Sequence, residues 1–145
     1  MKAESMTTPR AAKSPPIHMI DREADRLTQL ALSREDAMPQ VCGLLLREIN
    51  RATIRTAARF PSDIVTMQSR VAFVDSGTGA ERTVELVYPG DADISAGRIS
   101  ILTPIGAGLI GLREGQSILW PDREGHERNL TIVKVEQAAS TSPGP

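Results

Sequence analysis

The spacing of apolar residues changes its period once along this chain, between residues 58 and 70. In the first part, apolar side chains recur every three or four residues, as on one face of a helix: Ile20, Ala24, Leu27 and Ala31. In the second part, apolar and polar residues alternate, as they do in half-buried strands. A helical part followed by a strand part restricts this chain of 145 residues to an α+β fold.

The helical part contains a second apolar stripe of similar spacing: Met38, Cys42, Leu45, Ile49 and Ala52. A break at residues 33–39 separates the stripes, and Pro39 suits the first turn of a new helix. Residues 17–59 are therefore predicted to form a short antiparallel helical hairpin of the coiled-coil type. A first helix of about a dozen residues, rising ~1.5 Å per residue, makes a stubby arm of about 20 Å.

The strand part follows a connector, residues 60–69, in which Pro61 prevents a continuing helix. Alternation predicts five strands, which we place at residues 70–75, 82–89, 98–102, 117–120 and 129–136. One short helix is expected between the third and fourth strands, capped by Thr103, begun by Pro104 and ended near Gly115. Residues 70–137 thus predict an antiparallel sheet carrying one short helix.

This predicted helix holds three glycines, Gly106, Gly108 and Gly111. No Gly-Lys-Ser/Thr sequence follows them, and no long crossover helix surrounds them, so neither a P-loop nor a dinucleotide site is indicated. Each interior glycine costs a helix about 1 kcal/mol relative to alanine. A close approach of the helix to the sheet would offset that cost, so we interpret the glycines as architectural.

Overall composition excludes several classes of protein. The net charge of −1 provides no basic field for direct nucleic-acid binding. A single cysteine excludes an intrachain disulfide and a cysteine-based zinc site, and two histidines make a His-rich metal site improbable. No segment approaches the ~20 apolar residues of a membrane span. We expect a cytoplasmic protein whose polar ends, residues 1–16 and 138–145, are a disordered leader and tail.

Charged residues provide candidate sites but assemble no active site. Glu35 and Asp36 fall at the tip of the predicted hairpin, where acids could hold Mg²⁺ or could merely keep a loop soluble. Asp91 and Asp93 lie in a turn-rich loop, residues 88–97. The second helix is expected to carry a basic ridge of Arg47, Arg51 and Arg55, which suits either solvent or a partner's carboxylate or phosphate groups. No catalytic residue, metal or cofactor is predicted.

Several segments together resemble a known family over about residues 17–137: DIVTMQSRVAFVD, VELVYPGDAD, GRISILTPIGAGLIGLREGQSILWP and LTIVKVE. They resemble the Rnk family, regulators of nucleoside diphosphate kinase, and through it the Gre-type transcript cleavage factors. The resemblance implies an FKBP-like domain over residues 70–137 that docks on RNA polymerase near its secondary channel. The residues we expect to contribute contacts are Asp91, Asp93, Pro104, Arg113, Arg47 and Arg51.

In Gre factors, acids at the tip of a long coil reach the catalytic Mg²⁺ of the polymerase, whereas the hairpin predicted here is short. We therefore expect a monomeric, non-catalytic regulator of transcription that meets DNA only through polymerase and affects nucleoside diphosphate kinase indirectly. Two alternatives remain open. One is a cleavage factor that acts through Glu35 and Asp36, and the other is a protein that binds a metabolic kinase directly.

Overall fold

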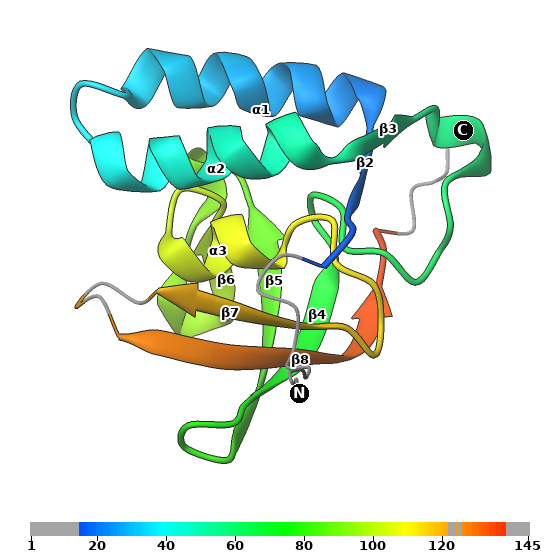
Figure 1. Ribbon diagram of the computed structural model, residues 1–145, viewed down its shortest axis with the longest axis vertical. Helices are drawn as coiled ribbons and strands as arrows, with labels where there is room; N and C mark the ends of the chain where they lie inside the picture. The colour runs from blue at the N-terminus through cyan, green and yellow to red at the C-terminus, as the bar shows by residue number, and fades with distance from the viewer. Residues whose placement is uncertain (1–14, 122–123, 125, 139–145) are drawn as a thin grey trace, which may run out of the picture.

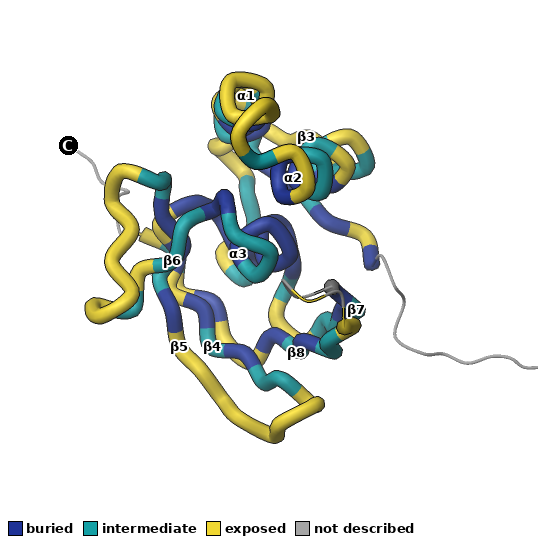
Figure 2. Tube along the Cα trace, turned by 90° about the vertical axis from the view of Figure 1, so that its left-hand side faces the viewer, coloured by how far each residue is buried: buried dark blue, intermediate teal, exposed yellow. Residues whose placement is uncertain are grey.

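The computed structural model describes residues 15–121, 124 and 126–138, so most of the expected leader and tail lies outside the described residues. It contains three layers (Figure 1). A five-stranded sheet forms one layer, a short helix lies on its concave face, and two longer helices pack over that helix (Figure 2). The mixed α+β fold predicted from the change in hydrophobic period is confirmed.

All five predicted strands are present: β4 (Arg70–Asp75), β5 (Ala80–Val87), β6 (Arg98–Ser100), β7 (Ser117–Pro121) and β8 (Glu127–Glu136). Their order across the sheet is β6-β5-β4-β8-β7. The expectation of a wholly antiparallel sheet is wrong, because β6 pairs with β5 in parallel. Two 3₁₀ turns in the preceding loop carry the chain back along β5 before β6 begins, so both strands run in one direction.

The short helix α3 (Pro104–Leu109) begins as predicted and ends earlier. The Thr103 hydroxyl accepts a hydrogen bond from the Gly106 N–H at 3.0 Å, which caps the first turn. The helix ends at Leu109 instead of continuing towards Gly115, because Gly111 adopts a φ of 85°. There the N-terminal strand β2 (His18–Ile20) crosses, and the His18 N–H donates to the Gly111 carbonyl at 3.2 Å.

The two glycines inside α3 confirm the predicted close approach. A Cβ built at Gly106 would lie 2.3 Å from the Ser100 carbonyl oxygen, and one at Gly108 would lie 2.9 Å from the Trp120 ring. Real Cβ atoms do not approach other atoms so closely, so only glycine lets this helix lie directly on β6 and β7. The third glycine, Gly111, lies after the helix and serves the crossing of β2 instead.

The helices α1 (Asp21–Arg34) and α2 (Pro39–Arg51) lie side by side and are joined by residues 35–38, which we call the tip (Figures 1 and 2). We refer to α1 and α2 as the helical pair. Fourteen residues give α1 a length of about 21 Å. At the other end of the pair, β2 and β3 (Thr53–Arg55) form a two-stranded parallel ribbon that the sequence did not predict.

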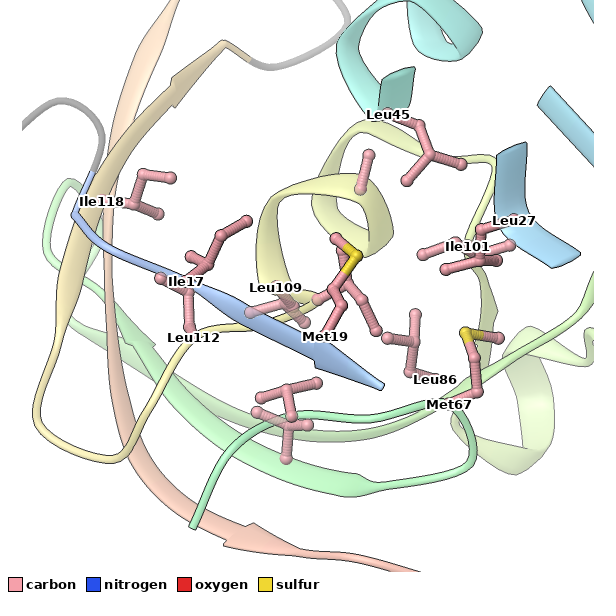
Figure 3. Packing of buried hydrophobic residues seen from close by; sticks show 14 of the residues in the cluster. Ile17, Met19, Leu27, Leu45, Met67, Leu86, Ile101, Leu109, Leu112 and Ile118 are labelled. Atoms are coloured by element: carbon pink, nitrogen blue, oxygen red, sulfur yellow. The ribbon is translucent and has the colours of Figure 1, made fainter. Parts of the chain in front are cut away.

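The helical pair shares one core with the sheet. Leu27 and Leu45 belong to the same buried cluster as Leu86, Ile101 and Leu109 (Figure 3). The expected stubby arm is therefore packed on the rest of the molecule through its apolar inner face. The expected connector also contributes to packing, since residues 64–67 are all buried.

Candidate partner-binding surface

The loop before β6 and the start of α3 flank one edge of the sheet, and we refer to residues 88–104 as the β6 edge. Asp93 and Arg98 are joined by two backbone hydrogen bonds, of 3.0 and 2.9 Å. The Asp93 carboxylate also accepts hydrogen bonds from the Ser95 hydroxyl at 2.7 Å and the Ser95 N–H at 3.1 Å. The hydrogen bond from the Ser95 hydroxyl is the main reason why the pKa of Asp93 lies below its usual value. Asp93 is thus exposed and yet fixed in place.

Ile94 is the most exposed large apolar residue described, at 84%. It follows Asp93 directly and starts the second 3₁₀ turn, Ile94–Ala96. Sequence reasoning missed it, although an isoleucine outside any periodic stripe in a polar loop was a signal. A single exposed apolar side chain is common on protein surfaces, so Ile94 is a candidate contact only because it lies beside the fixed carboxylate of Asp93.

At the other end of β6, hydrogen bonds order the start of α3. The Thr103 hydroxyl donates to the Ser100 carbonyl at 2.8 Å, and the Ser100 hydroxyl accepts from the Leu102 N–H at 2.9 Å. Pro104 is half-buried in the first turn of α3. Asp93 thus lies at the start of β6 and Pro104 beyond its end, while Asp91 is exposed in the 3₁₀ turn Pro89–Asp91.

Arg113 does not join this edge. The Arg113 Nε lies 3.3 Å from Asp63 Oδ2. The backbone N–H of Arg113 donates a hydrogen bond to Gln116 Oε1 at 2.9 Å. Arg113 also lies near His18, where burial first and the positive charge of Arg113 second lower the pKa of the imidazole. These contacts make Arg113 a link between residues 60–69, which were predicted to be a connector, and the turn before β7.

The predicted basic ridge is broken. Arg55 lies in β3 beyond the end of α2, because the helix stops at Arg51. Arg51 itself turns inward, where its Nη2 lies 2.8 Å from Glu48 Oε1 and its Nη1 donates to the Pro15 carbonyl. Only Arg47 of the three remains exposed on α2.

The tip residues Glu35 and Asp36 are exposed, and their carboxylates make no hydrogen bond or ion pair with the residues that the structure describes. Within that same part of the chain, no three His, Cys, Asp or Glu side chains gather closely enough to hold a metal ion. None of the described helices combines the length and the apolar character needed to cross a bilayer.

A seam joins the start of α1 to the turn before β4. Glu23 Oε1 accepts a hydrogen bond from the Met67 N–H at 3.1 Å, and the Arg26 guanidinium lies 5.6 Å from the centre of the Tyr88 ring. Burial raises the pKa of Glu23. These residues line a hollow of about 290 Å³, and Gln68 lines it too. Gln68 adopts a φ of 67°, which residues with a side chain rarely adopt.

Comparison with known proteins assigns the chain to a family. The family described as transcription elongation factor, GreA/GreB, C-term matches residues 60–137. The regulator of nucleoside diphosphate kinase of Escherichia coli K12 is 34% identical over 122 residues, which cover 84% of this chain and 90% of that protein. Transcription elongation factor GreA of Vibrio parahaemolyticus is 44% identical over 72 residues, which cover 50% of this chain and 45% of that protein.

The fold has a solved counterpart. The structure described as prokaryotic transcription elongation factor GreA/GreB from Nitrosomonas europaea superimposes with a TM-score of 0.66 at 35% identity. The match covers 84% of this chain and 98% of that chain. Sequence and fold agree, and the chain belongs to the regulators of nucleoside diphosphate kinase, the Rnk family, with a GreA/GreB-type C-terminal domain.

Proposed function

We propose that this protein is a non-catalytic transcription regulator that binds RNA polymerase near the secondary channel. The observation that carries the proposal is the packing of a short helical pair on the sheet domain of a GreA/GreB-type chain. Any effect on nucleoside diphosphate kinase is then indirect, through gene expression. The relatives named as elongation factors support polymerase as the partner.

The lack of catalysis follows from reach. The resemblance to Gre factors implies that a coil which carries acids down the channel is several tens of ångströms long, whereas α1 is about 21 Å long. Leu27 and Leu45 commit the inner face of the helical pair to the shared core, so it cannot extend without exposing apolar surface. Glu35 and Asp36 therefore stay close to the body of the protein.

The β6 edge is our candidate for the docking surface. It combines Asp91, Asp93, Ile94 and Pro104 on a backbone that hydrogen bonds hold in one conformation. A surface that is already ordered loses little conformational entropy when a partner binds. Arg47 could add a contact from the helical pair, whereas Arg51 and Arg113 are engaged within the protein.

The proposal includes the finer organisation that the resemblance implies. Residues 17–59 would act as a short coiled-coil-type unit, residues 60–69 as its junction, and residues 70–137 as an FKBP-like domain. The protein would work as a cytoplasmic monomer, without a cofactor, and would meet DNA only through polymerase. Light scattering of the purified protein tests the oligomeric state.

Gel filtration with core RNA polymerase tests the partner. We expect co-elution at micromolar concentrations, and separate elution of the two proteins would refute the proposal. A pull-down with nucleoside diphosphate kinase in the absence of polymerase tests direct kinase binding, which the name of the Escherichia coli relative makes worth examining. Capture of the kinase there would favour that alternative.

A backtracked elongation complex tests the remaining alternative. Adding the protein should leave the transcript at its full length, because the tip acids do not reach the catalytic centre. Transcript shortening that disappears in the Glu35→Gln, Asp36→Asn double variant would instead identify the protein as a cleavage factor.

A further inference from the structure

One end of the concave sheet face is left uncovered by α3. The helix has six residues and spans about 9 Å, whereas the ten residues of β8 span about 33 Å. The strands thus continue past the helix and leave a hollow of about 300 Å³. Its lining comes from four neighbouring strands, the β4–β5 turn and α3: Asp75, Thr78, Arg82, Ile105, Trp120, Arg128 and Leu130.

The inner part of this hollow is apolar. Trp120 and Leu130 form its floor on β7 and β8, and Ile105 faces them from the first turn of α3. Trp120 is only 6% exposed, and its indole N–H has no acceptor among the residues that the structure describes. A buried donor without an acceptor is costly in a folded protein, so the Trp120 indole N–H lies in an environment that does not satisfy it fully.

The rim of the hollow is charged. Arg128 Nη1 lies 3.0 Å from Asp75 Oδ2, which balances one guanidinium against one carboxylate. Arg82 stands above the Phe73 ring at 5.9 Å and forms no ion pair with a described residue. Among the described residues that line the hollow, Arg82 is thus a guanidinium that can pair with a single negative charge on a ligand.

We propose that this hollow binds a small organic monoanion, a carboxylate attached to a compact apolar body. The apolar body packs on Trp120, Leu130 and Ile105, while the carboxylate pairs with Arg82 at the rim. Arginine suits this role because its planar donors match a carboxylate geometrically. None of the lining residues is Asp93, Ile94 or Pro104, although Ile105 directly follows Pro104 in α3.

The full-length protein offers a direct measurement, because Trp120 is its only tryptophan. We would titrate it with cyclohexanecarboxylate and follow tryptophan fluorescence and the single indole N–H resonance. Cyclohexanecarboxamide is the neutral control of the same shape. We expect saturable changes in both signals with the acid and much weaker binding of the amide, since only the acid can pair with Arg82.

Two matched variants decide whether Arg82 is responsible. Arg82→Gln removes the rim charge and should weaken binding of the acid by about tenfold, as expected for loss of a hydrogen bond to a charged group. Arg70→Gln removes an exposed arginine from β4, where it points away from the hollow, and should leave binding unchanged. Equal binding of acid and amide, or an Arg82→Gln protein that binds like the wild type, would overturn the proposal. Because no polymerase is present, either outcome leaves the proposed function untouched.

Discussion

The tip and the β6 edge both present acids to solvent, but they differ in how firmly those acids are held. At the tip, no described residue fixes the carboxylates of Glu35 and Asp36. At the β6 edge, Asp93 is held by two hydrogen bonds from Ser95 and two backbone bonds with Arg98. Fixed groups bind a partner with less loss of entropy, so the contrast indicates which surface is suited to docking.

The largest expected effect compares the packing of α3, which lies beside the β6 edge, with the packing of α2, which leads from the tip. Gly106→Ala should destabilise the protein by about 3 kcal/mol, because the new Cβ would lie against the Ser100 carbonyl and no side chain can yield. Gly43→Ala in α2 meets nothing within 4 Å and should stabilise by about 1 kcal/mol through helix propensity. Urea unfolding of both variants measures the two changes. If both substitutions raise the free energy of unfolding, or both lower it, then α3 and α2 do not differ in packing as described.

The second prediction compares the two surfaces in binding. Ile94→Asp should weaken binding to core polymerase by about tenfold, because it replaces an exposed apolar side chain with a charge that resembles its acidic neighbours. The Glu35→Gln, Asp36→Asn double variant should bind within about twofold of the wild type. Fluorescence anisotropy of labelled protein measures both affinities. The comparison would be reversed if the tip variant lost binding and the Ile94 variant kept it.

Local sequence signals were enough to predict the strands of the five-stranded sheet and the start of the short helix. Alternation located all five strands, and Thr103-Pro104 marked the start of α3, because caps and strand periods are set by neighbouring residues. The end of α3 depends instead on β2 crossing at Gly111, a contact between residues far apart in the chain. The same reason hid the β2–β3 ribbon and the parallel pairing of β6, which no local pattern encodes.

The contact role expected of the candidate site residues stays a prediction, and the structure shows only where they lie. Asp91, Asp93 and Pro104 lie in the β6 edge, but Arg113 lies with Asp63 and Arg51 with Glu48. Sequence alone could not show those ion pairs, because each arginine was equally free to face solvent. The position of Ile94 in a polar loop, outside any apolar stripe, was a local signal of exposure, but how far it is exposed depends on what the rest of the fold covers.

The third prediction concerns the seam between the start of α1 and the turn before β4. Gln68 is the third residue of the turn from Thr66 to Ser69 and has a φ of 67°, which favours glycine. Gln68→Gly should stabilise the protein by about 0.5 kcal/mol, since relief of the left-handed strain outweighs the added freedom of the unfolded chain. Gln68→Ala keeps the strain and should leave stability unchanged. Urea unfolding resolves the pair, and equal stability of the two variants would contradict the strain argument.

The smallest expected effect depends on pH and on Glu23, which holds α1 to the Met67 N–H. Burial raises the pKa of this carboxyl above its ordinary value of 4.5, so in the folded protein it keeps its proton to higher pH than in the unfolded chain. Between the two pKa values the folded state binds more protons, and stability therefore falls as the pH rises through that window.

Glu23→Gln retains an oxygen that can accept from Met67 and cannot ionise. Its stability relative to the wild type should therefore improve between pH 4 and pH 7 in urea unfolding. Asp25→Asn, at an exposed position on the same helix, is the matched control and should show no such trend. A Glu23→Gln difference that stays constant with pH would mean that the carboxyl at the seam is not desolvated, and that the two regions meet less closely there than their shared core implies.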